Sequence, residues 1–384
     1  MDQQAVLTRR PTIIDSTLRD GEQAPGVVFA PNERRQIAEL LATVGVDEIE
    51  AGTPAMGGEE LEFLKWCTQL GVPCRTWCRA TESDIAAARE TGLAHVHVGL
   101  PVSEIQLSAF GFTREWVRRR VPDCMRFCGD SFESVSLGLM DASRADPEFV
   151  LEVVHAAADL GYCRVRLADT TGVLTPSGVV NFLRWFAGVS VPIEFHAHND
   201  LGMATANAVT ALENGARAIS ATALGIGERA GNARLEEVAL VLALSWGAIA
   251  GLNLAAVKEL ARVVAGAAGR AIAPDKPIVG DLVFTHETGI HVAGALRDPL
   301  SFLPIEPQSF GLGSPSIRIG RHSGSRSIQH ALSTRAVEID RQTASELVPH
   351  VRRRSEALGR NLESTEVEAI YYEFIDARAA DRTG

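Results

Sequence analysis

The sequence lacks several features that would each indicate a particular class of protein. It has no apolar run approaching the roughly 20 residues that a membrane-spanning helix needs, and its first residues do not form a secretory signal. It has no excess of basic residues either: the net charge of −11 disfavours nucleic acid as a partner, because binding phosphates requires a clustered basic surface. We therefore expect a soluble, cytoplasmic protein that acts on small molecules, with no membrane or nucleic acid partner.

Cysteine is scarce, and its spacing does not match a common metal motif. The six cysteines include the pairs Cys74/Cys78 and Cys124/Cys128, each with three intervening residues, whereas zinc ribbons place two residues between their cysteines. In a cytoplasmic chain free thiols are the expected state. We assign these cysteines no function.

The sequence is rich in one alternation: a short β-branched run, a loop and an amphipathic stretch, repeated eight times. The predicted strands are 12–17, 48–52, 74–79, 95–100, 134–140, 164–169, 193–198 and 218–224, and the helices that follow them are 31–44, 57–70, 82–91, 113–128, 146–160, 175–187, 202–214 and 234–248. Eight such units predict a (β/α)8 (TIM) barrel. An open doubly wound sheet is disfavoured, because the first strand is not followed by a Gly-rich phosphate turn.

Two stretches do not follow this alternation. Residues 118–136 fit a barrel helix leading into a strand poorly. After residue 250, a helical segment near 254–268 precedes a Gly/Pro/Ser-rich stretch at 298–316 and helices near 324–334, 343–357 and 364–378. We expect residues 12–280 to form a catalytic barrel, and residues 281–384 to form a linker and a mainly helical C-terminal accessory region that contributes to the active site of a dimer.

Two histidines at the end of the seventh predicted strand suggest a metal site. Side chains alternate along a strand, so His196 and His198 project from one face. On its own, such a pair is structural as often as metal-binding. Strands 7, 8 and 1 are neighbours in a closed barrel, however, and Asp20 and Asn232 follow strands 1 and 8 at the same end. These ligands predict a divalent metal site suited to Mg, Mn, Co or Zn, which could chelate a 2-oxoacid, with Arg19 stabilising the developing alkoxide or enolate.

Five motifs in a fixed order resemble one family. They are DSTLRDGEQ at 15–23, HAHND at 196–200, GIGERAGN at 225–232, FTHETGIH at 284–291 and GRHSG at 320–324. Together they resemble the metal-dependent barrel acyltransferases and lyases that include 2-isopropylmalate, citramalate and homocitrate synthases. Within this family, the homocitrate synthases of nitrogenase cofactor assembly are the most similar group. The similarity lies in residues 51–56 and 141–146 and in the length of the chain.

The resemblance implies an acyltransferase that condenses acetyl-CoA, as co-substrate, with 2-oxoglutarate and water to give homocitrate and CoA. It implies metal binding by Asp20, His196 and His198 with Asn232 nearby, electrostatic catalysis by Arg19, substrate contact by Thr170, and acid/base catalysis by His291 from the partner subunit of a homodimer. We add Gln23, Arg79 and His97 as candidates for substrate binding. Arg79 and His97 could supply positive charge or donors to a distal carboxylate, which favours a dicarboxylate substrate.

Three positions depart from the family pattern: Met140 stands where Glu is usual, Phe302 where Tyr is usual, and Leu224 where many synthases have Asn. Met cannot carry protons and Phe has no hydroxyl, so proton transfer is the step that these changes affect. Three alternatives stay open: the same chemistry on 2-oxoisovalerate or pyruvate, a lyase that cleaves a 3-hydroxyacyl-CoA, and a non-catalytic binding homologue. For the GRHSG segment, an anion-binding turn and a structural turn are equally compatible with the sequence.

Overall fold

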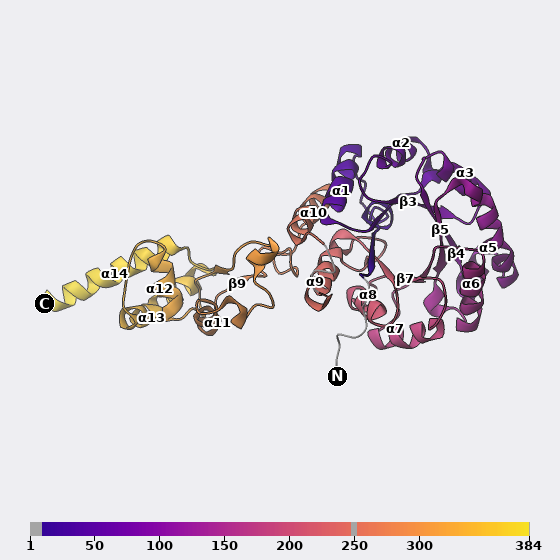
Figure 1. Cartoon of the computed structure of the whole chain (residues 1–384). Coiled ribbons are helices and arrows are strands. Elements are labelled where there is room, and N and C mark those ends of the chain that lie inside the picture. The colour runs from indigo at the N-terminus through magenta and orange to yellow at the C-terminus, as the bar shows by residue number, and fades with distance from the viewer. Residues whose placement is uncertain (1–9, 247–251, 384) are drawn as a thin grey trace. The chain divides into compact units, whose positions relative to one another are not determined.

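The structure is a computed structural model that describes residues 10–246 and 252–383 (Figure 1). The chain divides into two compact units, Met1–Ile272 and Ala273–Gly384. This division lies before residue 280, where we expected the barrel to end. No helix within the described residues is long and apolar enough to cross a bilayer.

The first unit is a closed barrel of eight parallel strands in the order β1 to β8, which confirms the predicted fold class (Figure 1). The strands are β1 (Thr12–Asp15), β2 (Glu48–Gly52), β3 (Cys74–Arg79), β4 (His95–Pro101), β5 (Ser134–Met140), β6 (Arg164–Asp169), β7 (Ile193–Ala197) and β8 (Ala218–Ala221). Ile14 in β1 is paired with Glu48 on one side and with Ser220 on the other, which closes the barrel. The C-terminal ends of β7, β8 and β1 are therefore adjacent.

Helices surround the strands. They are α1 (Pro31–Val44), α2 (Gly58–Cys67), α3 (Glu82–Arg89), α5 (Arg114–Cys128), α6 (Pro147–Asp159), α7 (Pro176–Leu183), α8 (Ala204–Glu213) and α9 (Leu235–Trp246). The end predicted for the last of these, residue 248, lies outside the described residues. Two further helices occur in this unit: α4 (Glu104–Phe110), which the sequence reading missed, and α10 (Leu254–Ala267), which packs against α1.

The segment that fitted a barrel helix poorly forms one nonetheless. Helix α5 continues to Cys128 although Pro122 lies inside it. A proline removes one helical hydrogen bond. Here the buried face of Val117, Val121 and Cys124 packs on the barrel and holds the helix in place.

The inside of the barrel, its lumen, contains charged side chains where branched apolar residues are usual. These lumen ion pairs are formed by Glu48, Glu50, Arg75, Arg164, Arg166 and Glu194, all buried. Arg164 illustrates the pattern: its Nη2 lies 2.6 Å from Glu48 Oε1, and its Nε lies 2.7 Å from Glu194 Oε2. Burial alone would raise the pKa of Glu48, but the guanidiniums of Arg75 and Arg164 outweigh it and hold this pKa at about 2.

The second unit is mainly helical, as predicted for the accessory region. It contains a two-stranded parallel sheet of β9 (Thr285–His286) and β10 (Ser316–Ile317) and the helices α11 (Gly289–Ala295), α12 (Ser325–Ser333), α13 (Arg341–Leu358) and α14 (Ser364–Thr383). Its own core is apolar and includes Ile328, Leu332, Leu347, Val351 and Val367. Contacts among α12, α13 and α14 therefore stabilise this unit independently of the barrel core.

Candidate metal centre and substrate cavity

Three of the four predicted metal ligands meet at the C-terminal end of the barrel strands. Asp20, His196 and His198 are buried, and one ligand atom from each lies within 4.8 Å of the others. Asp20 Oδ2 is 3.3 Å from His196 Nε2 and 3.9 Å from His198 Nε2, and the two Nε2 atoms are 3.2 Å apart. We refer to these three residues as the triad.

Asp20 is positioned by a tight turn that follows β1. Residues Thr17–Gly21 form a single π-helical turn, which Ser16 caps by accepting a hydrogen bond from Asp20 N at 3.4 Å. The Asp15 carboxylate accepts hydrogen bonds from the backbone N of Thr17 at 2.8 Å and from its hydroxyl at 3.0 Å. The DST segment thus fixes the turn that directs Asp20 towards the histidines.

The chemistry of the triad fits a divalent cation. Asp20 Oδ2 is buried, and no described residue offers it a hydrogen bond. Burial and the neighbouring His196 lower the pKa of His198 to about 3, so this imidazole is neutral, which is the form that binds metals. Burial opposes ionisation of Asp20, but the charge of Arg19 outweighs it and lowers the pKa of this carboxyl. An ionised carboxylate and two imidazoles that converge are a mixed O/N ligand set.

Asn232 lies beside the triad. It forms an isolated antiparallel bridge with His198, which lies one residue beyond β7. Its Nδ2 donates to Ile226 O at 3.1 Å, whereas its Oδ1 is buried without a partner among the described residues. The free oxygen is the atom that a metal would require.

Arg19 is held next to the triad by two carboxylates. Its Nε donates to Glu50 Oε1 at 2.5 Å, and its Nη1 donates to Asp20 Oδ1 at 3.0 Å. Only 9% of the side chain is exposed, and the guanidinium lies 5.5 Å from the ring centre of Trp77. A rotationally fixed positive charge therefore borders the site.

A cavity of about 240 Å³ extends from the triad into the lumen. Of the candidates from the sequence, Arg19, Gln23, His97 and Thr170 line it together with the triad. The Thr170 hydroxyl oxygen accepts a hydrogen bond from Asp141 N at 2.8 Å, which leaves its proton available to the cavity. Met140 also lines the cavity, so its apolar side chain occupies the position where the family usually has a carboxylate.

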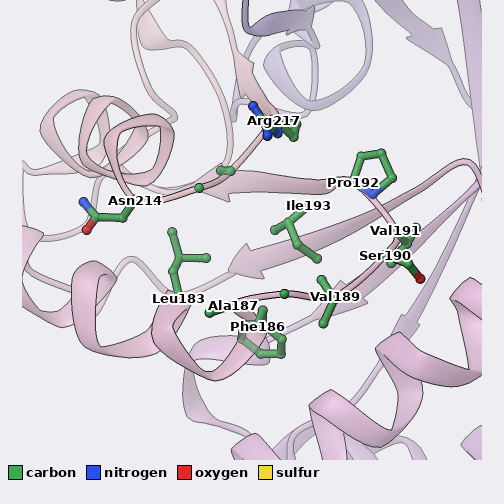
Figure 2. Close-up of a pocket in the computed structure, with 13 residues that line it drawn as sticks. Leu183, Phe186, Ala187, Val189, Ser190, Val191, Pro192, Ile193, Asn214 and Arg217 are labelled. Atoms are coloured by element: carbon green, nitrogen blue, oxygen red, sulfur yellow. The ribbon is translucent and has the colours of Figure 1, made fainter. Parts of the chain in front are cut away.

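A larger hollow of about 500 Å³ lies at the opposite end of β7 and β8 (Figure 2). It is lined by Leu183, Phe186, Pro192, Ile193, Asn214 and Arg217, among others. Its lining contains no carboxylate, histidine or cysteine, so it lacks groups for acid/base chemistry or metal binding.

The structure does not bring Arg79 into the cavity. The strand ends at this residue, and Asp84 in α3 accepts from its Nε at 2.9 Å and from its Nη2 at 2.8 Å. The Arg79 side chain is 66% exposed. Besides Arg19, the arginines that line the cavity are Arg166 in β6 and Arg229, neither of which was predicted from the sequence. Arg164, Arg166 and Ala168 alternate along one strand and share one face, but Arg75, Trp77 and Arg79 do the same in β3, so alternation alone could not select Arg166.

His291 belongs to the second unit, in α11. Its ring is exposed and stacks on Phe302, with ring centres 4.2 Å apart and an interplanar angle of 22°. The nearby GRHSG segment is a structural turn. Its Gly320 N donates to Ser323 Oγ at 2.9 Å and its His322 N donates to the Glu287 carboxylate at 3.3 Å, so these amides already have acceptors.

Comparisons with known proteins agree with this architecture. The HMGL-like family model matches residues 10–264, and the model described as Homocitrate synthase post-HMGL domain-like matches residues 278–358. The chain is 44% identical to a homocitrate synthase from Frankia alni, over 83% of this chain and 92% of that protein. It is 40% identical to homocitrate synthase 1 from Nostoc sp., over 92% and 95%, and 38% identical to 2-isopropylmalate synthase 2 from Caldanaerobacter subterraneus, over 94% and 95%.

Solved structures share the barrel. The HMG-CoA lyase from Bacillus subtilis has a TM-score of 0.62 at 21% identity, covering 69% of this chain and 95% of that one. At this identity the likeness concerns the fold alone. The family models and the sequence relatives together show that the chain belongs to the HMGL-like family and, within it, to the group of 2-isopropylmalate and homocitrate synthases.

Proposed function

We propose that this protein is an acyltransferase that condenses acetyl-CoA with a 2-oxoacid and water, and that 2-oxoglutarate is the preferred 2-oxoacid, so that the products are homocitrate and CoA. The observation that carries the proposal is the triad with Arg19 held beside it. A divalent ion bound by Asp20, His196 and His198, with Asn232 as a further ligand, would supply Lewis-acid polarisation of the keto group.

The protein groups around the cavity account for the remaining requirements. Arg19 presents a fixed positive charge where an oxyanion would develop. The electrostatic stabilisation that such a charge gives is greatest in a site with little water. The Thr170 hydroxyl can donate to a bound substrate. Met140 provides an apolar wall, so the proton that leaves the acetyl methyl group must be accepted by another residue.

We assign that proton transfer to His291, delivered by the second unit of a partner subunit in a homodimer. Support comes from the surface around it: Ile290 is 77% exposed, and Leu300 and Phe302 are also exposed. Exposed apolar residues grouped around a functional histidine favour burial in an interface.

The named relatives include homocitrate synthases and a 2-isopropylmalate synthase at similar identities, so the choice of 2-oxoacid rests on the cavity. Its positively charged lining supports 2-oxoglutarate over 2-oxoisovalerate or pyruvate. A role for the product in nitrogenase cofactor assembly rests on the similarity of residues 51–56 and 141–146 to the synthases of that process.

A thiol-release assay tests this function. The protein is stripped of metal, reloaded with Mg²⁺, Mn²⁺, Co²⁺ or Zn²⁺, and supplied with acetyl-CoA and one of a panel of 2-oxoacids. We expect CoA release that requires both a metal and 2-oxoglutarate and that His196→Ala abolishes. A reloaded protein that releases no CoA with any 2-oxoacid would favour the alternative of a non-catalytic binding homologue.

A further inference from the structure

A gap beside Arg166 connects its guanidinium to the cavity. Gly138 in β5 lies between Gly99 in β4 and Arg166 in β6 in the sheet register, and all three residues line the cavity. Neither glycine has a side chain, and aromatic rings border this side of the cavity instead: a Cβ atom placed on Gly99 would lie 3.0 Å from Trp77 Cζ2. A Cβ atom placed on Gly138 would lie 2.3 Å from His97 Nε2, which shows that the imidazole reaches into the same gap.

The path from the triad to this gap is also unobstructed. Ala168 is paired with His196 in the register and follows Arg166 by two residues on the same face of β6. It lines the cavity with only a methyl group. A ligand anchored at the triad can therefore extend along β6 to the guanidinium.

Arg166 can offer a terminal guanidinium nitrogen to such a ligand. Its Nε donates to Glu194 Oε1 at 2.5 Å, and its Nη2 lies 2.6 Å from Glu50 Oε2. Nη2 is buried and makes no hydrogen bond with a described residue, so its contact with Glu50 is an ion pair only. Nη1 forms neither a hydrogen bond nor an ion pair with the described residues, and it is the terminal nitrogen left for a ligand. The two glutamates fix the plane of the guanidinium, so Nη1 has a defined direction.

The tautomer of His97 follows from its partner. Its Nδ1 lies 2.7 Å from Ser136 Oγ, and that oxygen accepts from Arg75 Nη1 at 3.2 Å. Because Ser136 accepts from Arg75, its own proton is available to His97 Nδ1, and when it is donated there the imidazole carries its proton on Nε2. Burial and the charge of Arg166 lower the pKa of His97 well below its usual range, so the ring is neutral and Nε2–H is a donor facing the gap.

We propose that Nη1 of Arg166 and Nε2 of His97 bind the distal carboxylate of the 2-oxoacid and thereby select a dicarboxylate substrate. This inference rests on the proposed function, since it assumes that the keto-acid end lies at the triad. A branched apolar chain beside Arg166 would cover a guanidinium nitrogen and an imidazole N–H without offering them acceptors, which a site of this kind disfavours strongly.

Charge balance supports the same selection. The lumen ion pairs contain equal numbers of guanidiniums and carboxylates, and Arg19 offsets Asp20. A divalent ion at the triad would add two positive charges. A dianionic 2-oxoacid neutralises them, whereas a monoanion leaves one buried charge uncompensated.

The test measures binding of 2-oxoglutarate, 2-oxoisovalerate and pyruvate to the full-length, metal-loaded protein by calorimetry. Arg166→Lys keeps a positive charge for the two glutamates but loses the directed Nη1, and His97→Phe removes the Nε2 donor. We expect each to weaken 2-oxoglutarate binding by about 10- to 100-fold and to leave pyruvate binding nearly unchanged. Arg164→Lys is the matched control: Arg164 is on the same strand, pairs with the same Glu194 and does not line the cavity.

Two outcomes would overturn the inference: 2-oxoglutarate affinity that survives both substitutions, or an equal loss of affinity for 2-oxoglutarate and pyruvate. If Arg166→Lys does not fold, Gly138→Ala gives a second test, because its methyl group would lie 2.3 Å from His97 Nε2 and so displaces this donor without removing a charge. Unaltered 2-oxoglutarate affinity in Gly138→Ala would then contradict the inference. If the unmodified protein discriminates among the 2-oxoacids but releases no CoA, the proposed function fails and the assignment of Arg166 and His97 stands.

Discussion

Arg19 contacts two carboxylates, yet its predicted contribution is to the rate of the reaction. We expect Arg19→Ala to lower kcat by about 100- to 1,000-fold, because removing one fixed hydrogen-bond donor to a developing oxyanion lowers kcat by this factor in other enzymes. Metal affinity should hardly change, since Arg19 is not a ligand. Steady-state kinetics and metal titration measure the two effects separately. Arg79→Ala, which removes an arginine outside the cavity, should leave kcat within about twofold. Loss of metal binding with turnover intact in the residual metal-loaded protein would make the role of Arg19 structural.

Leu224 is a residue whose backbone conformation does not suit it. Its φ of 60° lies in the left-handed region, where a Cβ costs roughly 1–2 kcal/mol and where Asn is tolerated far better than Leu. We expect Leu224→Asn to raise the free energy of unfolding by about 1 kcal/mol, as measured by urea denaturation. Leu201→Asn, at an exposed leucine without a positive φ, is the control and should not be stabilising. Equal stabilities of the two variants would show that the turn is unstrained.

The strands of the barrel place acids and bases in contact, and this arrangement predicts a pH dependence. The folded pKa of Glu48 is about 2, below its usual 4.5, so its stabilising contribution is present above pH 4.5 and is lost as the pH falls towards 2. The shift corresponds to about 3 kcal/mol. We expect Glu48→Gln to lower stability at pH 7 and to reduce the decrease between pH 5 and pH 3, as measured by urea unfolding. Glu62→Gln, at an exposed surface pair, should follow the unmodified protein at every pH. Parallel curves for Glu48→Gln and the unmodified protein would refute this contribution.

Elements were more predictable than side-chain partners. The third strand, 74–79, and the first helix, 31–44, were predicted at the bounds they have, because apolar alternation and Gly or Pro boundaries are local signals. Helix α5 could not be foreseen from its proline, since packing of its buried face decides its stability. The region of the triad was inferable because barrel topology places the ends of strands 7, 8 and 1 together.

The cavity lining was less predictable. Arg79 and Arg166 both occur in predicted strands, and nothing local distinguishes them. The difference arises from tertiary contacts. Asp84 binds the Arg79 guanidinium outside the cavity, whereas Glu50 and Glu194 hold that of Arg166 inside the barrel. The sequence also did not indicate that the gap beside Gly138 would be shared by His97, because that depends on strand register.

At the scale of the whole molecule, the proposed dimeric site predicts complementation between defective subunits. Arg19 lies in the barrel unit and His291 lies in the second unit, so a site built from two subunits can be restored by mixing. In a random mixture of Arg19→Ala and His291→Ala protein, half of the dimers are hybrids, and each hybrid has one intact site. We expect recovery of up to about a quarter of the unmodified activity. A mixture of Arg19→Ala with Asp20→Ala, both altered in the barrel, should recover none. No recovery after verified subunit exchange would mean that each site is completed within one chain.

The lumen ion pairs also constrain how the barrel could be divided. Of the six residues that form these pairs, β1 to β4 contribute Glu48 and Glu50 against Arg75 alone, whereas β5 to β8 contribute Arg164 and Arg166 against Glu194 alone. Each half-barrel would thus close around an unbalanced buried charge, and two copies of the same half would double that imbalance. Opposite halves neutralise one another, so the two fragments should reassemble as a mixed pair while neither folds as a self-paired barrel.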